Sequence, residues 1–156
     1  MQLAKHIGVI FATFTVLVAA SPAAAALTRR EASLLVAMNH ARAAHGLAPL
    51  HTDPTLVRAA RSHSLDMLRH DYFAHGAFAA RMNAFHARGP IVGENLAWGS
   101  GALGSAAHVV QMWLTSPEHR ANLLRPGFTR VGLATPVGAF AGSSDVTMVT
   151  ADFGGR

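Results

Sequence analysis

The sequence of 156 residues contains no cysteine. Disulfide bonds, thiolate metal ligands, a lipoprotein anchor and a thiol nucleophile are therefore excluded, and a folded domain must be stabilised by packing. Lysine occurs once, at Lys5, and charged residues make up only 13% of the chain. The arginines are scattered from Arg29 to Arg156 rather than clustered, which argues against a nucleic-acid-binding surface.

Long apolar runs are also missing after the first 26 residues. The start of the chain has the three parts of a secretory signal: Lys5, the uncharged apolar residues 7–20 and the alanine-rich residues 21–26. We expect cleavage after Ala25 or Ala26, and retention of the segment as a membrane anchor is the alternative. Residues 27–156 then form one secreted or periplasmic domain without a membrane span, which we expect to be a monomer.

Helical signals dominate the first part of this domain. Thr28 and Glu31 have the spacing of a capping box at the start of a helix predicted over residues 28–45. Asp53 and Pro54 are typical of the start of a second helix, which apolar spacing extends to about residue 70. Three further helices are predicted, over residues 78–86, 105–115 and 116–124. The helix over 105–115 is apolar on nearly all sides, and we expect it to be buried.

Residues with a preference for β-structure come mainly at the end of the chain. The predicted strands cover residues 91–98, 128–137 and 145–153, and the last two are joined by a loop with Gly138 and Gly142. Helices come first and strands last, without regular alternation. This order predicts an α+β domain with a small, mostly antiparallel sheet covered by helices.

Three segments place ionisable side chains among apolar neighbours: residues 70–76 (HDYFAHG), 93–97 (GENLA) and 113–124 (WLTSPEHRANLL). Glu94 is informative because a carboxylate inside an apolar strand needs a partner to be buried. His119 lies in the first turn of a predicted helix, where the helix dipole disfavours the charged imidazolium. A neutral imidazole can act as a metal ligand or a hydrogen-bond acceptor.

The order of these motifs resembles the CAP superfamily, which includes cysteine-rich secretory proteins, venom antigens and plant pathogenesis-related proteins. Residues 72–75 (YFAH), 93–97 and 113–124 carry the resemblance, together with 39–42 (NHAR) and 46–50 (GLAPL). It covers about residues 30–154 and is strongest to the compact bacterial branch with an SCP-like extracellular domain. The resemblance implies a three-layer α-β-α sandwich.

The resemblance also implies a central cleft lined by two histidines and two acidic residues. His75, Glu94 and His119 match three of these positions. Ser116 occupies the position of the second acidic residue, so that carboxylate is missing here. The resemblance therefore implies a candidate zinc site with His75 and His119 as ligands and Glu94 as a third ligand or as a group that orients them, with weak binding of the divalent metal.

Three other interpretations of the cleft remain. It could be a metal-assisted, peptidase-like hydrolase with Glu94 as general base, although no HExxH or GxSxG signature is present. The three residues could form a purely structural hydrogen-bonded cluster. The cleft could also bind a small molecule or lipid against apolar walls, for which the candidates are Phe73, Phe78, Leu96 and Trp98.

We therefore expect a secreted CAP-domain protein without robust catalysis. Its cleft, built on His75, Glu94 and His119, binds a small ligand or, weakly, a divalent ion. The first alternative is the hydrolase. The second is a domain that interacts with an anionic envelope component through its basic surface. We expect the remaining histidines to be surface or packing residues, with His63 on the packing seam of the second helix.

Overall fold

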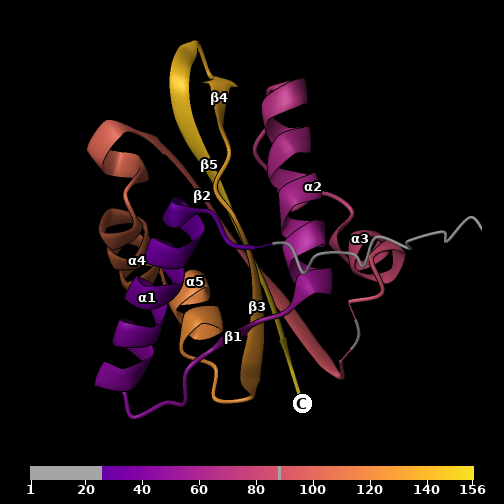
Figure 1. The fold of residues 1–156 in the computed structure, drawn as a ribbon, viewed down its shortest axis with the longest axis vertical. Helices are drawn as coiled ribbons and strands as arrows, with labels where there is room; N and C mark the ends of the chain where they lie inside the picture. Colours follow the sequence, from indigo (N-terminus) through magenta and orange to yellow (C-terminus); the bar gives the residue numbers. More distant parts are fainter. Residues whose placement is uncertain (1–25, 88) are drawn as a thin grey trace, which may run out of the picture.

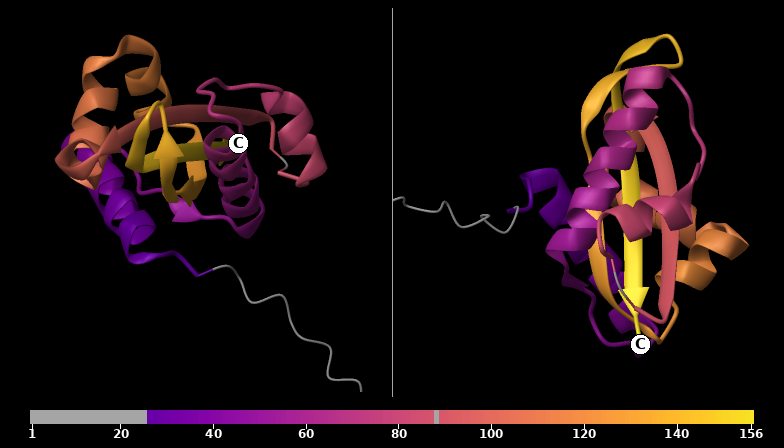
Figure 2. Two further views of the ribbon diagram at one scale, coloured as in Figure 1. Left: turned by 90° about the horizontal axis from the view of Figure 1, so that it is seen from above. Right: turned by 90° about the vertical axis from the view of Figure 1, so that its right-hand side faces the viewer.

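The computed structural model describes residues 26–87 and 89–156. The predicted signal segment therefore lies, except for Ala26, outside the described residues. Among the described residues, no helix is long and apolar enough to cross a membrane. Figure 1 shows a central sheet with helices on both sides, and the view from above in Figure 2 shows the same three layers.

The helical elements begin and end close to where the sequence predicts. Helix α1 (Arg29–Ala44) has the predicted capping box, in which the Thr28 N–H donates to Glu31 Oε2 (2.8 Å) and the Glu31 N–H donates to Thr28 Oγ1 (3.2 Å). Helix α2 (Pro54–His70) begins after Asp53, whose side chain accepts from the first-turn N–H groups. The remaining helices are α3 (Phe78–Ala84), the 3-10 turn η1 (Gly101–Gly104), α4 (Ala106–Thr115) and α5 (Pro117–Leu123).

The sheet is mixed and is organised around one long strand. Its strands are β1 (His51–Thr52), β2 (Ile91–Ser100), β3 (Phe128–Ala134), β4 (Val137–Phe140) and β5 (Ser143–Gly155). The order is β1-β3-β5-β2, and β4 also pairs with β5. All pairs are antiparallel except β1 with β3. The predicted α+β class and mostly antiparallel sheet are confirmed.

Two apolar cores hold helices against opposite faces of the sheet. Helices α1 and α4 pack on one face through residues that include Leu34, Met38 and Trp113. Helix α2 packs on the other face, where Met67 contacts a cluster with Leu96 and Met148. Because side chains alternate along a strand, Glu94 and Asp152 lie on the same face as Leu96 and Met148. This face is covered by α2 and α3.

The expectation that the apolar helix over residues 105–115 is buried is correct for only one side of the helix. Helix α4 lies in an outer layer, so only one side of it contacts the sheet (Figure 1). Val109, Val110 and Trp113 are buried, whereas Met112 is 37% exposed. Trp113 is also fixed by a hydrogen bond from its Nε1 to the carbonyl oxygen of Leu96 (3.0 Å).

A buried arginine stabilises the structure where a disulfide cannot. Arg42, in the motif NHAR of α1, is completely buried, and burial lowers its pKa. Its guanidinium donates to four carbonyl oxygens, those of Ala48, Leu123, Arg125 and Phe128, at 2.8–3.2 Å. This one side chain therefore ties α1 to the end of α5 and the start of β3.

Candidate functional site

Glu94 is the centre of the candidate site. It lies on β2, directly across from Asp152 on β5, and its side chain is only 2% exposed. Oε1 accepts from His75 Nδ1 (2.7 Å), and Oε2 is bonded to Arg81 Nη2. Both carboxylate oxygens therefore have partners, which satisfies the requirement that a buried charge be paired.

His75 comes from the segment between α2 and α3. Because a carboxylate accepts hydrogen bonds, the contact with Glu94 Oε1 places a proton on His75 Nδ1, and the neutral form of this imidazole has its lone pair on Nε2. The imidazole is 58% exposed, so Nε2 is open to solvent. A carboxylate that holds a histidine in this tautomer is the usual companion of a metal-binding imidazole.

His119 faces the same region from α5. Its Nδ1 lies 2.7 Å from Ser116 Oγ, and its carbonyl oxygen accepts from Asn95 Nδ2 (2.9 Å). Burial lowers the pKa of His119 below its ordinary value, so its neutral form predominates at pH 7. Ser116, at the position where the resemblance implies a second carboxylate, therefore orients His119 through a hydroxyl instead.

Glu94 is bonded to His75, whereas His119 is bonded to Ser116, so the alternative of one hydrogen-bonded cluster of His75, Glu94 and His119 is not what the described residues form. Among the hydrogen bonds of residues 26–87 and 89–156, none joins Glu94 to His119. Arg81, on α3, takes the position opposite His75 on the carboxylate. Its Nη1 also donates to the carbonyl oxygen of His75 (3.3 Å), so Arg81 holds both members of the pair.

Asp152 is a second carboxyl in the site that sequence analysis did not identify. It is completely buried, and neither carboxyl oxygen has a hydrogen-bond partner among the described residues. Its nearest cation is Arg81, with Nη2 3.9 Å from Oδ1. Burial raises the pKa of Asp152 well above its usual range, and the charge of Glu94 raises it further. Asp152 therefore keeps its proton to a higher pH than an exposed aspartate does.

His63 also lies closer to the site than its sequence position indicates. It is buried in α2, with Nε2 3.0 Å from the carbonyl oxygen of Ala74 and 3.9 Å from Glu94 Oε2. Burial lowers the pKa of His63. Its placement on the packing seam of α2 is confirmed. In the sequence, only the helical spacing of His63 with the apolar residues Ala60 and Met67 could have predicted that His63 lies on the buried side of α2.

Two asparagines fix the strand edge beside His119. Asn122 Nδ2 donates to the Glu94 carbonyl oxygen and to Asn95 Oδ1, both at 3.0 Å. Together with the bond from Asn95 to His119, these contacts join α5 to β2. The two asparagines therefore position backbone groups of His119 and Glu94.

The donor set for a metal is limited. Within the described ranges, no group of three or more histidine or acidic side chains is arranged to hold a metal ion. The geometry explains this result for Glu94, whose two oxygens are held by His75 and Arg81. His75 and His119 each use Nδ1 in a hydrogen bond, to Glu94 and Ser116 respectively.

The apolar walls expected for a lipid are only partly present. Leu96 is buried in the core beneath α2 and is not available as a wall. Trp98 is partly exposed, and its ring packs edge-on against Phe140 with centroids 5.1 Å apart. Phe73 is also partly exposed, whereas Phe78 packs against the core between α2 and α3.

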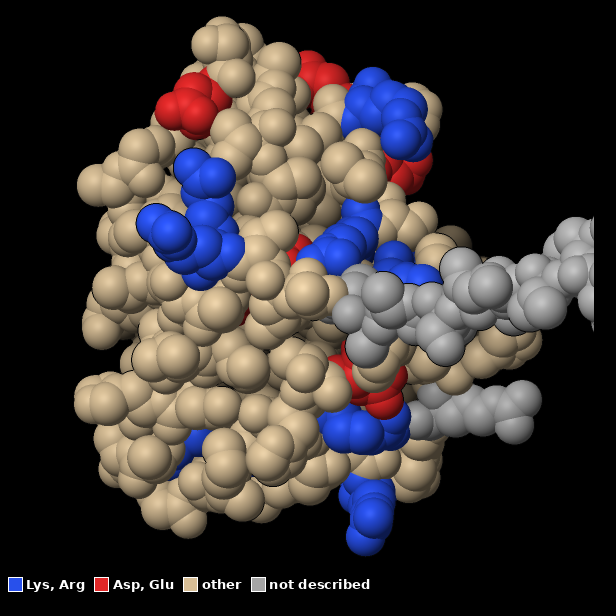
Figure 3. All heavy atoms as spheres, in the orientation of Figure 1, with Lys and Arg blue, Asp and Glu red and all other residues tan. Residues whose placement is uncertain are grey.

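Basic side chains are distributed over the surface in separate groups. Figure 3 shows several such groups on one face, some of them beside acidic side chains. Arg61 with Glu31 and Arg130 with Asp53 are two pairs of this kind. The face in view has no single continuous basic patch, which agrees with the scattered arginines of the sequence.

Comparison with known proteins finds similar proteins in bacteria and in plants. The chain is 37% identical over 100 residues to the uncharacterized protein YkwD of Bacillus subtilis, covering 61% of this chain and 38% of that protein. It is 35% identical over 88 residues to pathogenesis-related protein 1C of Nicotiana tabacum, covering 56% and 45%. The chain thus spans less than half the length of these relatives.

A solved structure shows the same fold. The crystal structure of an extracellular protein containing a SCP domain from Bacillus anthracis superposes with a TM-score of 0.66 at 26% identity, covering 81% of this chain and 40% of that one. The cysteine-rich secretory protein family, CAP, matches residues 35–153, which include His75, Glu94 and His119. This chain therefore belongs to the CAP family.

Proposed function

We propose that this chain is a secreted CAP-domain protein whose cleft binds a divalent cation weakly through His75 and His119. The observation that supports this proposal best is the state of the two imidazoles. Each has its Nδ1 held by a hydrogen bond, to Glu94 in one case and to Ser116 in the other. When Ser116 accepts from His119, both Nε2 atoms offer a lone pair, which is the form that binds zinc.

Glu94 acts in this proposal as the group that orients His75. Its oxygens are bonded to His75 and Arg81, and its side chain is almost completely buried. A general base must reach the proton that it removes, and a carboxylate with both oxygens engaged is poorly placed to do so. This arrangement supports binding rather than the hydrolase alternative. A bound zinc ion would supply a Lewis acid to a small ligand in the cleft.

Weak affinity follows from the number of ligands. Stable zinc sites use three or four protein ligands, and two imidazoles leave water to complete the coordination. The cationic Arg81 next to Glu94 also removes negative charge that would attract a cation. We therefore expect zinc to exchange freely with solution, with an affinity tighter than about 1 mM but far from that of a structural site.

Calorimetric titration of residues 27–156 with zinc tests the proposal. The variants His75→Ala and His119→Ala should each weaken zinc binding more than tenfold, because each removes one of two protein ligands. His40→Ala, which changes an exposed histidine on α1, is the matched control and should leave the affinity unchanged. Zinc binding that is absent at about 1 mM, or equally weakened by all three variants, would contradict the proposal.

A further inference from the structure

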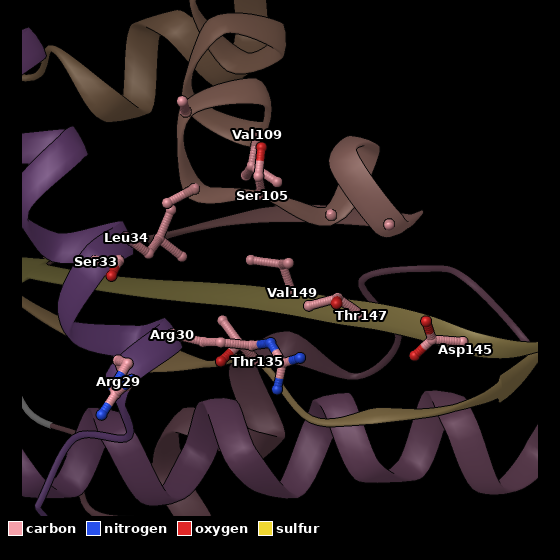
Figure 4. A pocket seen from close by; sticks show the side chains of 14 residues that line it. Arg29, Arg30, Ser33, Leu34, Ser105, Val109, Thr135, Asp145, Thr147 and Val149 are labelled. Carbon is pink, nitrogen blue, oxygen red and sulfur yellow. The ribbon is translucent and has the colours of Figure 1, made fainter.

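Two cavities of the domain differ in their relation to the candidate site. The cavity of about 520 Å³ between the start of α1, the start of α4 and β5 (Figure 4) shares none of its described lining residues with the site around Glu94. A cavity of about 390 Å³ between α2 and α3 has His63 and Arg81 in its wall. Both of these side chains are bonded to the segment that carries His75.

This segment, residues 72–77, lies between α2 and α3 and has little support from its own main chain. Residues 73–77 are all exposed. Among the described residues, the main chain of residues 73–75 makes no hydrogen bond with other main-chain groups. The position of His75 therefore depends on the side chains that bond to the segment.

His63, on α2, holds the peptide unit that precedes His75. Its Nε2 lies 3.0 Å from the carbonyl oxygen of Ala74, and because a carbonyl oxygen only accepts, Nε2 donates. The Ala74 carbonyl and the His75 N–H belong to one planar peptide unit. A donor on this carbonyl therefore sets the plane from which the His75 side chain projects.

The His63 ring also supports the residue that follows His75. Gly76 has a left-handed backbone, with φ +56°, and a Cβ at this position would lie 3.7 Å from His63 Cε1. The His63 side chain is only 3% exposed, so the ring is enclosed within the domain. It therefore lies against the main chain on both sides of His75.

The other two contacts of the segment act on different atoms of His75. Glu94 Oε1 accepts from the ring Nδ1 at 2.7 Å, and Arg81 Nη1 donates to the His75 carbonyl oxygen at 3.3 Å. Glu94 can hold the ring only where the main chain brings Nδ1 within reach. The short bond to Glu94 therefore requires that the peptide unit before His75 be in place.

We propose that His63 is a positioning residue for His75. Its hydrogen bond to the Ala74 carbonyl oxygen fixes the peptide unit before His75 and so keeps Nδ1 at Glu94. This role rests on the proposed function, in which His75 Nε2 binds a divalent cation. Without the bond, the exposed segment takes up other conformations, His75 leaves Glu94 for part of the time, and zinc binding is weaker.

Two buried amides of different length test this role. Glutamine carries its NH2 donor about as far from Cα as histidine carries Nε2, whereas the asparagine donor lies one bond closer to Cα. His63→Gln should therefore keep the zinc affinity within about twofold of the unmodified protein, and His63→Asn should weaken it at least about fivefold. Calorimetric titration with zinc measures both affinities.

The ¹⁵N chemical shift of His75 Nδ1 separates positioning from general destabilisation. His63→Asn should move this shift toward that of an imidazole exchanging between tautomers. The shift of His119 Nδ1 should stay unchanged, because Ser116 on the far side of the site holds that ring. His63→Leu also lacks the donor but leaves no buried amide without a partner, so it should fold and show the same change.

The His75 shift tests the positioning role with or without zinc. If the unmodified protein binds no zinc, the proposed function fails and this shift alone decides the role of His63. The positioning role is overturned if His63→Asn and His63→Leu keep the His75 shift of the unmodified protein, or if His63→Gln changes it as much as they do. Equal changes in His75 and His119 would show that His63 is only a structural residue.

Discussion

Replacing Glu94 by alanine should destabilise the domain by about 3 kcal/mol or more and lower its melting temperature by about 10 °C. The change leaves the guanidinium of Arg81, which is 11% exposed, without the carboxylate that compensates its burial. It also removes the acceptor of His75 Nδ1. Most of the loss comes from Arg81, because His75 is largely open to water. Urea unfolding at pH 7 measures the change in the free energy of unfolding.

Two further variants test the cause of this loss. Glu118→Ala removes an exposed carboxylate on α5 and should change stability by less than about 0.5 kcal/mol. Adding Arg81→Met to Glu94→Ala should restore part of the stability, because the unpaired cation is then gone. The account of Glu94 is wrong if Glu94→Ala costs less than about 1 kcal/mol, or if the double variant is no more stable than the single one.

Asp152→Asn should make the domain more stable at pH 7. Burial raises the pKa of Asp152 above its unfolded value of about 3.8, so the folded carboxyl keeps a proton that the unfolded chain releases. The stability associated with Asp152 is therefore complete below about pH 4 and is lost as pH rises toward the folded pKa. Asparagine cannot ionise and fills the same space, so it avoids this loss.

The expected signature is a difference that depends on pH. The stability of the Asp152→Asn variant relative to the unmodified protein should increase from about pH 4 upward, by up to about 1.4 kcal/mol per pH unit. Denaturant unfolding of both proteins between pH 4 and pH 8 measures this difference, and titrations common to both cancel. Parallel stability curves would show that Asp152 is ionised in the folded protein.

Local signals in the sequence predicted most of the fold correctly. The Thr28–Glu31 capping box and Asp53-Pro54 place the starts of α1 and α2, because both depend on neighbours within one turn. The two-residue strand β1 and the strand β4 were missed, since they are too short for a periodic pattern. The burial of α4 was overestimated because apolar composition does not say which layer a helix occupies.

The candidate site was predicted in part for the same reason. His75, Glu94 and His119 lie in motifs that are recognisable within a few residues. Arg81 and Asp152 lack such a motif. Asp152 joins the site only because the register of β2 on β5 sets it opposite Glu94, and Arg81 only because α3 folds back over the same face. Such long-range pairing is a property of the folded sheet.

Hydrogen bonds hold both histidines of the candidate site in place. Glu94 and Arg81 hold His75 by hydrogen bonds, and Asp152 lies next to Arg81. Ser116 and Asn95 fix His119 from the other side of β2. In the proposed metal site, the Nε2 atoms of these two imidazoles, rather than the carboxylates, are the groups that contact the ion.

The tautomeric state of these imidazoles in solution tests this account most directly. Long-range ¹H–¹⁵N NMR spectra of residues 27–156 at pH 7 distinguish a protonated Nδ1 from a protonated Nε2 in each histidine. We predict that Nδ1 carries a proton in both His75 and His119, and that zinc shifts their Nε2 signals but not those of His40. Protonated Nε2 atoms in His75 and His119, or zinc shifts no larger than those of His40, would contradict it.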